Sequence, residues 1–134
     1  MEEDLIKFVI WTKLKIRIHL KPSESSVYFS EREIWWSSLG VNIGYEQDGK
    51  NDNFERPILI LKKFSKNVLW VLPLTRTKKT DSKYYFQLEQ GGEDSFVVLS
   101  QIRMISNKRL SRRMRVISQI EFQQIKNKIR DFLI

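Results

Sequence analysis

The sequence contains no cysteine and only one histidine, His19. The absence of cysteine excludes a disulfide scaffold and any thiolate metal site, and it makes a cytoplasmic location the default expectation. One histidine is too few for a histidine metal centre. A lone histidine near the end of a predicted helix is usually a surface residue rather than a catalyst. We therefore expect no metal and no other cofactor.

Several other functional patterns are also missing. The sequence has no glycine-rich phosphate loop, no His-Glu-x-x-His motif and no nucleophile elbow around a serine. The first residues are acidic, whereas a signal peptide starts with positive charge, and charged residues interrupt the apolar stretch that follows. We expect neither an export signal nor a membrane span. An enzyme of this composition would work with arginines, hydroxyls, carboxylates and amides.

The charge of the chain is strongly positive. Its 134 residues, enough for one domain with a real core, include 24 Lys and Arg against 16 Asp and Glu, with a formal net charge of +8 and a pI of about 9.8. This balance favours a polyanionic partner such as nucleic acid. Basic residues are densest between positions 103 and 115, where no acid occurs. This basic run either follows an RNA backbone or simply faces solvent.

Sequence patterns predict an α+β fold. Residues 2–20 fit a helix or a strand, and the absence of Gly and Pro before Pro22 favours the helix. Residues 22–26 are predicted to be a linker and residues 90–94 a turn. The predicted strands lie at residues 34–39, 54–61, 68–77, 84–88, 95–99 and 101–105, and residues 112–117 are expected to pair back on 101–105. Without alternating strands and helices, these elements indicate a small curled sheet or partial barrel.

A C-terminal helix is predicted from its start signals. Ser118 and Glu121 form a capping box, in which each side chain satisfies an orphan backbone donor. Ile117 and Phe122 fit the hydrophobic staple that accompanies such a cap.

The central prediction concerns residues 54–77. Two apolar runs joined by residues 62–67 predict a hairpin, which brings Arg56 and Thr75 to the same end of a buried sheet. No acid lies between positions 56 and 80, so that end should attract phosphate. RNA carries its own nucleophile, the 2′-hydroxyl, so a ribonuclease needs only to hold the strand and to stabilise the developing charge. A guanidinium and a hydroxyl are suitable donors. In the alternative reading, Arg56 forms a salt bridge with Glu55 or Glu46, and Thr75 is a turn hydroxyl.

Two aromatic residues are also candidates for base stacking. Tyr45, in the loop of residues 40–53, is equally compatible with stacking and with packing. Trp70, in the middle of a predicted strand, is expected to fill the core.

Four ordered blocks carry a family resemblance: REIWWSSLGVNIGYEQDG, FERPILIL, LWVLPLT and SFVVLSQIRMISNKRL. Together they resemble the MazF/PemK family of toxin endoribonucleases of bacterial type II toxin-antitoxin systems. The resemblance implies a small SH3-like β-barrel with a C-terminal helix at residues 31–134, preceded by an extra helical extension and linker at residues 1–30. It also implies a homodimer, a cognate antitoxin and metal-independent cleavage of single-stranded RNA (mRNA) at short sequences. The expected products carry a 2′,3′-cyclic phosphate and a 5′-hydroxyl.

By position, the resemblance assigns catalytic roles to Arg56 and Thr75. It assigns substrate binding to Glu46 and Gln47, in a loop that in the family also contacts the antitoxin, and to Gln101. The segment of residues 48–55 is longer than the usual family spacing. Two other functions stay open: a toxin similar to CcdB that poisons DNA gyrase without cleaving, and a non-cleaving RNA-binding or repressor module.

Overall fold

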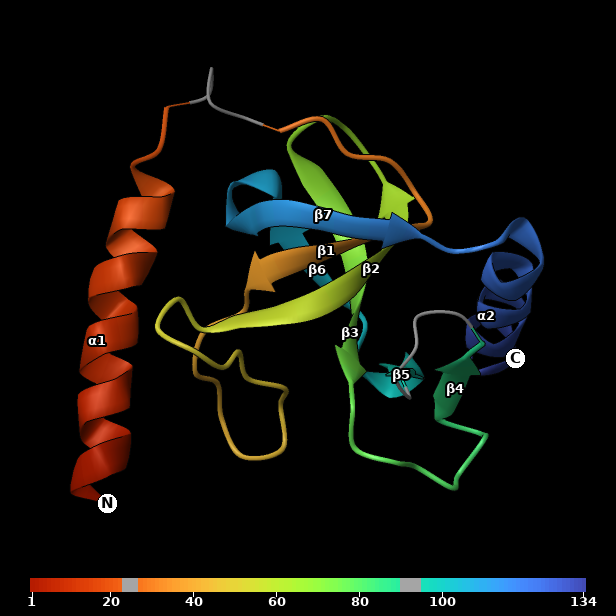
Figure 1. Ribbon diagram of the computed structural model, residues 1–134, viewed down its shortest axis with the longest axis horizontal. Helices are drawn as coiled ribbons and strands as arrows, with labels where there is room; N and C mark the ends of the chain where they lie inside the picture. The colour runs from red at the N-terminus through yellow and green to blue at the C-terminus, as the bar shows by residue number, and fades with distance from the viewer. Residues whose placement is uncertain (23–26, 90–94) are drawn as a thin grey trace.

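The computed structural model describes residues 1–22, 27–89 and 95–134. It is an α+β fold, as predicted, in which α1 and α2 lie on opposite sides of the strands (Figure 1). The elements in chain order are α1 (Glu2–His19), β1 (Glu33–Ser38), β2 (Glu55–Lys63), β3 (Val68–Thr75), β4 (Tyr85–Leu88), β5 (Ser95–Val98), η2 (Leu99–Gln101), β6 (Arg103–Ser106), η3 (Asn107–Arg109), β7 (Leu110–Val116) and α2 (Gln119–Asp131). The predicted turn at 90–94 and most of the predicted linker lie outside the described residues.

Seven antiparallel strands of the described chain form the sheet, with the order β4-β5-β3-β2-β1-β7. One edge of β3 pairs with β2, and its other edge pairs first with β6 and then with β5. Register shifts interrupt the β2–β3 and β1–β7 ladders. Such irregularities bend strands and increase their twist, which curls the sheet.

Two hydrophobic clusters fill the interior. One joins β1, β2, β3 and β5 to the inner face of α2 through Phe122 and Ile125. The other contains residues of β1, β2, β3, β6 and β7 together with Phe29. The apolar runs of the predicted hairpin contribute Ile58, Leu59 and Ile60, which are all fully buried. The strands that carry the candidate site are therefore anchored in the core.

Two sequence predictions about the sheet are wrong. The segment at 112–117 was expected to pair with 101–105, but β7 pairs with β1, and β6 pairs with β3. The short η3 between β6 and β7 redirects the chain, so these consecutive strands are not neighbours. Trp70 was expected in the core, but its side chain is 42% exposed and stacks edge-on against Phe64. Trp70 occupies an outward position of β3, whereas its sequence neighbours Leu69 and Val71 point inward.

Helix α1 packs on the base of the β1–β2 loop, which comprises residues 39–54. Trp11 and Ile18 are buried against Phe54, and the Trp11 and Phe54 rings lie 5.7 Å apart. The indole of Trp11 also approaches Gly40, which has a φ of +81° and leaves no space for a Cβ atom. Glycine is therefore required at this contact on both steric and conformational grounds.

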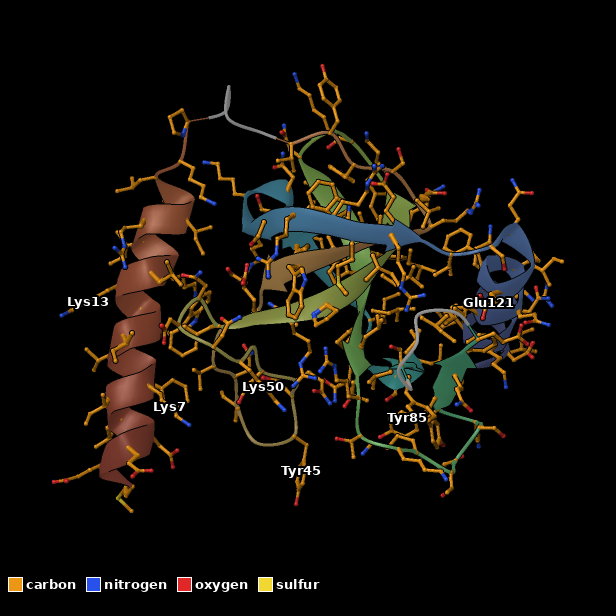
Figure 2. The ribbon with its side chains drawn as sticks, viewed as in Figure 1. Lys7, Lys13, Tyr45, Lys50, Tyr85 and Glu121 are labelled. Carbon is orange, nitrogen blue, oxygen red and sulfur yellow. The ribbon has the colours of Figure 1, made fainter. Side chains whose placement is uncertain are left out.

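Helix α2 begins with half of the predicted capping box. The Ser118 hydroxyl accepts a hydrogen bond from the Glu121 backbone N–H at 3.1 Å, and Ile117 and Phe122 are buried as the staple requires. The Glu121 carboxylate does not return to the helix start. It accepts instead from the backbone N–H of Glu89, just after β4, at 3.0 Å, and Figure 2 shows Glu121 on the side of α2 that faces β4. Glu121 therefore connects the helix to the sheet.

Candidate functional site

Arg56 and Thr75 line one open cavity of about 420 Å³. Arg56 lies at the start of β2, and Thr75 is the last residue of β3. The hairpin register pairs Ile58 with Pro73, so extending it by two positions brings Arg56 beside Thr75. The predicted hairpin thus forms, and it brings together the two residues to which the sequence assigned catalysis.

Two backbone carbonyls fix the Arg56 guanidinium. Its Nε donates to the Asp48 carbonyl at 2.5 Å, and its Nη1 donates to the Leu74 carbonyl at 3.0 Å. Nη2 makes no hydrogen bond to any residue that the structure describes. Burial lowers the pKa of the Arg56 guanidinium, whereas the nearby Asp48 carboxylate acts in the opposite direction. Because an arginine starts from such a high pKa, the group stays charged and presents its remaining N–H groups to the cavity.

The Thr75 hydroxyl is partly engaged. Its Oγ1 accepts a hydrogen bond from the backbone N–H of Thr77 at 3.2 Å, as in the turn-hydroxyl reading. No acceptor for its own proton is found among the described residues, so the hydroxyl can still donate to a ligand. The salt-bridge reading of Arg56 does not hold within the described chain, because the arginine bonds to carbonyls and the Glu55 carboxylate bonds to Arg112.

The cavity around Arg56 and Thr75 is rich in positive charge. Besides Arg56, its lining includes the aromatic Trp36 and three further basic residues, Lys50, Arg76 and Arg115. The acidic residue of the lining, Glu55, accepts a hydrogen bond from Arg112. Sequence reasoning did not assign Lys50, Trp36 or Arg115 to the site. Arg115 was missed because residues 112–117 were expected to pair with 101–105, whereas Arg115 lies beside Ile34 of β1.

Glu46, Gln47 and Gln101 line a second cavity of about 590 Å³, separate from the first. Gln101 holds the β1–β2 loop: its Oε1 accepts from the Gln47 N–H at 2.7 Å, and its Nε2 donates to the Tyr45 carbonyl at 3.0 Å. Glu46 accepts from the Ile43 N–H at 3.0 Å. Burial lowers the pKa of Arg103 in the same lining, and the charge of Glu46 opposes this shift. Tyr45 is fully exposed, and Figure 2 shows its side chain pointing away from the loop tip.

The linings of the two cavities include residues that are adjacent in the chain. Pro73 lines the second cavity and Leu74 the first. Gln47 of the second cavity precedes Asp48, whose carbonyl accepts the Arg56 hydrogen bond. The sequence-predicted residues therefore fall into two groups, Arg56 with Thr75 and Glu46 with Gln47 and Gln101, which are linked through the Pro73–Leu74 and Gln47–Asp48 peptide bonds.

The last part of the β1–β2 loop is a turn closed by backbone hydrogen bonds. Lys50 and Glu55 exchange two backbone hydrogen bonds of 2.7 Å. Between them, the Asn51 side-chain oxygen accepts a hydrogen bond from the Asn53 backbone N–H. Asn51 and Phe54 adopt positive φ angles of 62° and 52°. Residues 50–55 thus form a compact turn whose Phe54 side chain packs on α1.

Two arginines of the basic run form salt bridges within the chain. Arg112 pairs with buried Glu55, and Arg113 pairs with buried Glu33 at 3.2 Å. Burial alone would raise the pKa of both carboxyl groups. Their hydrogen bonds outweigh it and hold each pKa below the ordinary value. Part of the formal positive charge is therefore balanced by carboxylates of the same chain.

Within the described ranges, no three His, Asp or Glu side chains are grouped to hold a metal ion. None of the described helices is both long and apolar enough to span a bilayer.

Comparisons with solved structures support the fold. MazF from Deinococcus radiodurans superimposes with a TM-score of 0.64 at 17% identity, covering 80% of this chain and 98% of that one. Mycobacterium tuberculosis toxin MazF-mt6 gives 0.58 at 16% identity, covering 76% and 96%. An endoribonuclease in complex with its cognate antitoxin, from a mycobacterial species, gives 0.59 at 13% identity, covering 79% and 95%. No curated protein sequence matches the chain.

Residues 30–133 match the family described as PemK-like, MazF-like toxin of type II toxin-antitoxin system. This match covers most of the chain, including both strands that carry Arg56 and Thr75. The chain therefore belongs to the PemK-like, MazF-like toxin family of type II toxin-antitoxin systems.

Proposed function

We propose that this toxin is an endoribonuclease that cleaves single-stranded RNA, including mRNA in the cytoplasm, at short sequences. The observation that carries the proposal is the cavity in which Arg56 Nη2 and the Thr75 hydroxyl are both available to one ligand. Both groups are hydrogen-bond donors, and the basic residues around them favour a phosphate.

The reaction that suits these groups is internal transesterification. The RNA 2′-oxygen attacks the adjacent phosphorus and loses its proton, while the bond from phosphorus to the 5′-oxygen breaks and that oxygen takes up a proton. The products are a 2′,3′-cyclic phosphate and a 5′-hydroxyl. Arg56 and Thr75 would donate to the non-bridging oxygens, where negative charge grows in the transition state. Because carbonyls already fix the guanidinium, little reorganisation is needed during the reaction.

The second cavity would hold nucleotides next to the scissile phosphate. Glu46 and Gln47 provide polar groups for base edges, and exposed Tyr45 offers a ring for stacking. Gln101 uses both ends of its amide on the loop, so its role in substrate binding would be to hold Gln47 and Tyr45 in place. The β1–β2 loop would thus determine sequence preference.

The proposal includes two partners. A cognate antitoxin with an acidic, flexible segment would neutralise the toxin by occupying the basic cavity, since such a segment mimics phosphate charge. Family membership also supports a homodimer. Among the similar structures, the mycobacterial endoribonuclease and the MazF of Deinococcus radiodurans have each been solved with an antitoxin.

The deciding experiment combines purified toxin with a long RNA in excess chelator and maps both ends of every fragment. We expect cleavage without added metal, because Arg56 and Thr75 supply the charge stabilisation. Fragment ends with a 3′-phosphomonoester formed without a cyclic intermediate, or strict dependence on a divalent ion, would contradict the mechanism. Intact RNA together with inhibited DNA gyrase would favour the CcdB-like alternative, and RNA binding without cleavage would favour the repressor module.

A further inference from the structure

Helix α1 has a second apolar face that no described part of the chain covers. Only Trp11 and Ile18 of this helix are buried, and residues 2–10 are all exposed. Leu5, Val9 and Ile16 are 60%, 55% and 55% exposed. They lie on the side of α1 opposite to Trp11 and Ile18, given 100° of rotation per residue. Figure 2 shows neighbouring Lys13 pointing away from the domain.

The exposed face has the spacing of a helix-pairing seam. Leu5, Val9, Thr12 and Ile16 are separated by four, three and four residues, which is the alternation of coiled-coil core positions. Thr12 is the polar member, but its hydroxyl donates to the Phe8 carbonyl at 2.8 Å. The threonine therefore brings its methyl group to the seam without an unsatisfied donor.

Charge along α1 identifies the kind of partner. The first turn contains Glu2, Glu3 and Asp4, whereas the last turn contains Arg17 and His19. An antiparallel copy of the same helix would place the acidic end of each beside the basic end of the other. A parallel copy would place like charges together. The pattern is self-complementary only for the antiparallel arrangement, which is the one that a two-fold axis generates.

We propose that α1 pairs antiparallel with α1 of a second copy of this chain, through the seam of Leu5, Val9, Thr12 and Ile16. In this pair Leu5 packs beside Ile16 of the second copy, and Val9 beside its Thr12. Glu2 then lies near Arg17 of the second copy, on the same flank of the seam. The pairing covers the half of α1 that has no packing partner among the described residues, and it does not depend on RNA cleavage.

Disulfide trapping tests the register directly, because the chain has no cysteine of its own. With a rise of about 1.5 Å per residue, the two Leu5 positions of an antiparallel pair lie about 16 Å apart along the axis. A disulfide requires Cα atoms within about 7 Å, so Leu5→Cys or Ile16→Cys alone should stay monomeric on a denaturing gel. The double variant should be trapped as a covalent dimer after mild oxidation. Tyr28→Cys, at an exposed site outside α1, is the control.

The second test measures the mass of the protein in solution for variants of the seam and for variants in which the charges of Glu2 and Arg17 are exchanged. Leu5→Gln with Ile16→Gln should weaken the association made through α1 at least tenfold, without disrupting the homodimer expected of the family, whereas Tyr28→Gln should change neither. Glu2→Arg and Arg17→Glu should each weaken association, and their combination should restore it. The proposal is overturned if the double-cysteine variant is not trapped, or if the glutamine variant associates as well as the unmodified chain. It is also overturned if each single-cysteine variant is trapped with itself, because that result requires a parallel pair. These outcomes are independent of RNA cleavage, which is measured separately on the same samples.

Discussion

Replacing Thr75 with valine removes the proposed phosphate donor while keeping the shape of the side chain. The hydroxyl has one hydrogen bond in the described chain, from the Thr77 N–H at 3.2 Å, and Thr77 is exposed. Water can replace that bond, so its loss should cost at most about 1 kcal/mol of folding free energy. Losing a preorganised donor to a developing oxyanion costs about 10² to 10³ in rate. The rate should therefore fall far more than the stability.

The assay is single-turnover cleavage of a short single-stranded RNA, with urea unfolding of the same samples. Thr75→Ser keeps the donor and should retain activity within about tenfold. Thr80→Val, an exposed threonine that does not line the cavity, is the matched control and should cleave normally. If Thr75→Val cleaves within about threefold of the unmodified toxin while staying folded, the hydroxyl has no part in catalysis and our reasoning is wrong.

Three further predictions concern the residues around the cavity. Arg56→Lys keeps a positive charge but loses the fork that bonds to two carbonyls, so we expect kcat to fall at least about 10²-fold, and near-normal kcat would contradict the proposed geometry. Gln101→Leu removes both loop contacts and should raise KM about tenfold while kcat stays within about threefold, and the opposite split would make Gln101 a catalytic residue. The pKa of Glu55 lies below its ordinary value of 4.5, so its stabilising contribution is complete above pH 4.5 and is lost as the pH falls through the native pKa. Glu55→Gln should lower the free energy of unfolding at pH 7 by about 1–3 kcal/mol, and the variant should lose less of that free energy than the unmodified protein when the pH falls. Urea unfolding at pH 7 and pH 4 would measure both effects, and equal acid sensitivity of the two proteins would contradict this prediction.

The sequence predicted the elements whose signals are local. The apolar runs around Ile58 and Val71 and the short turn between them are sufficient to define the hairpin, and this pairing brings Arg56 beside Thr75. The Ser118 cap was equally readable because it involves residues three positions apart. The roles of the candidate site residues stay predictions.

Long-range features could not be predicted from the sequence. The partner of β7 depends on the direction that η3 gives to the chain, so Arg115 was not placed at the cavity. Trp70 faces outward because of its strand register, not because of its residue type. Gln101 contacts a loop more than 50 positions away, a distance over which no local pattern acts.

The paired arginines of β7 have a consequence for counterion release. Arg112 and Arg113 already form salt bridges with Glu55 and Glu33. RNA binding would therefore release fewer salt ions at these two arginines than at arginines without such partners. The cations that line the cavity are few, and each phosphate contact to a single strand contributes a slope of about −0.7 in log K against log salt. The affinity for RNA should therefore decline with ionic strength less steeply than the net charge of the chain suggests.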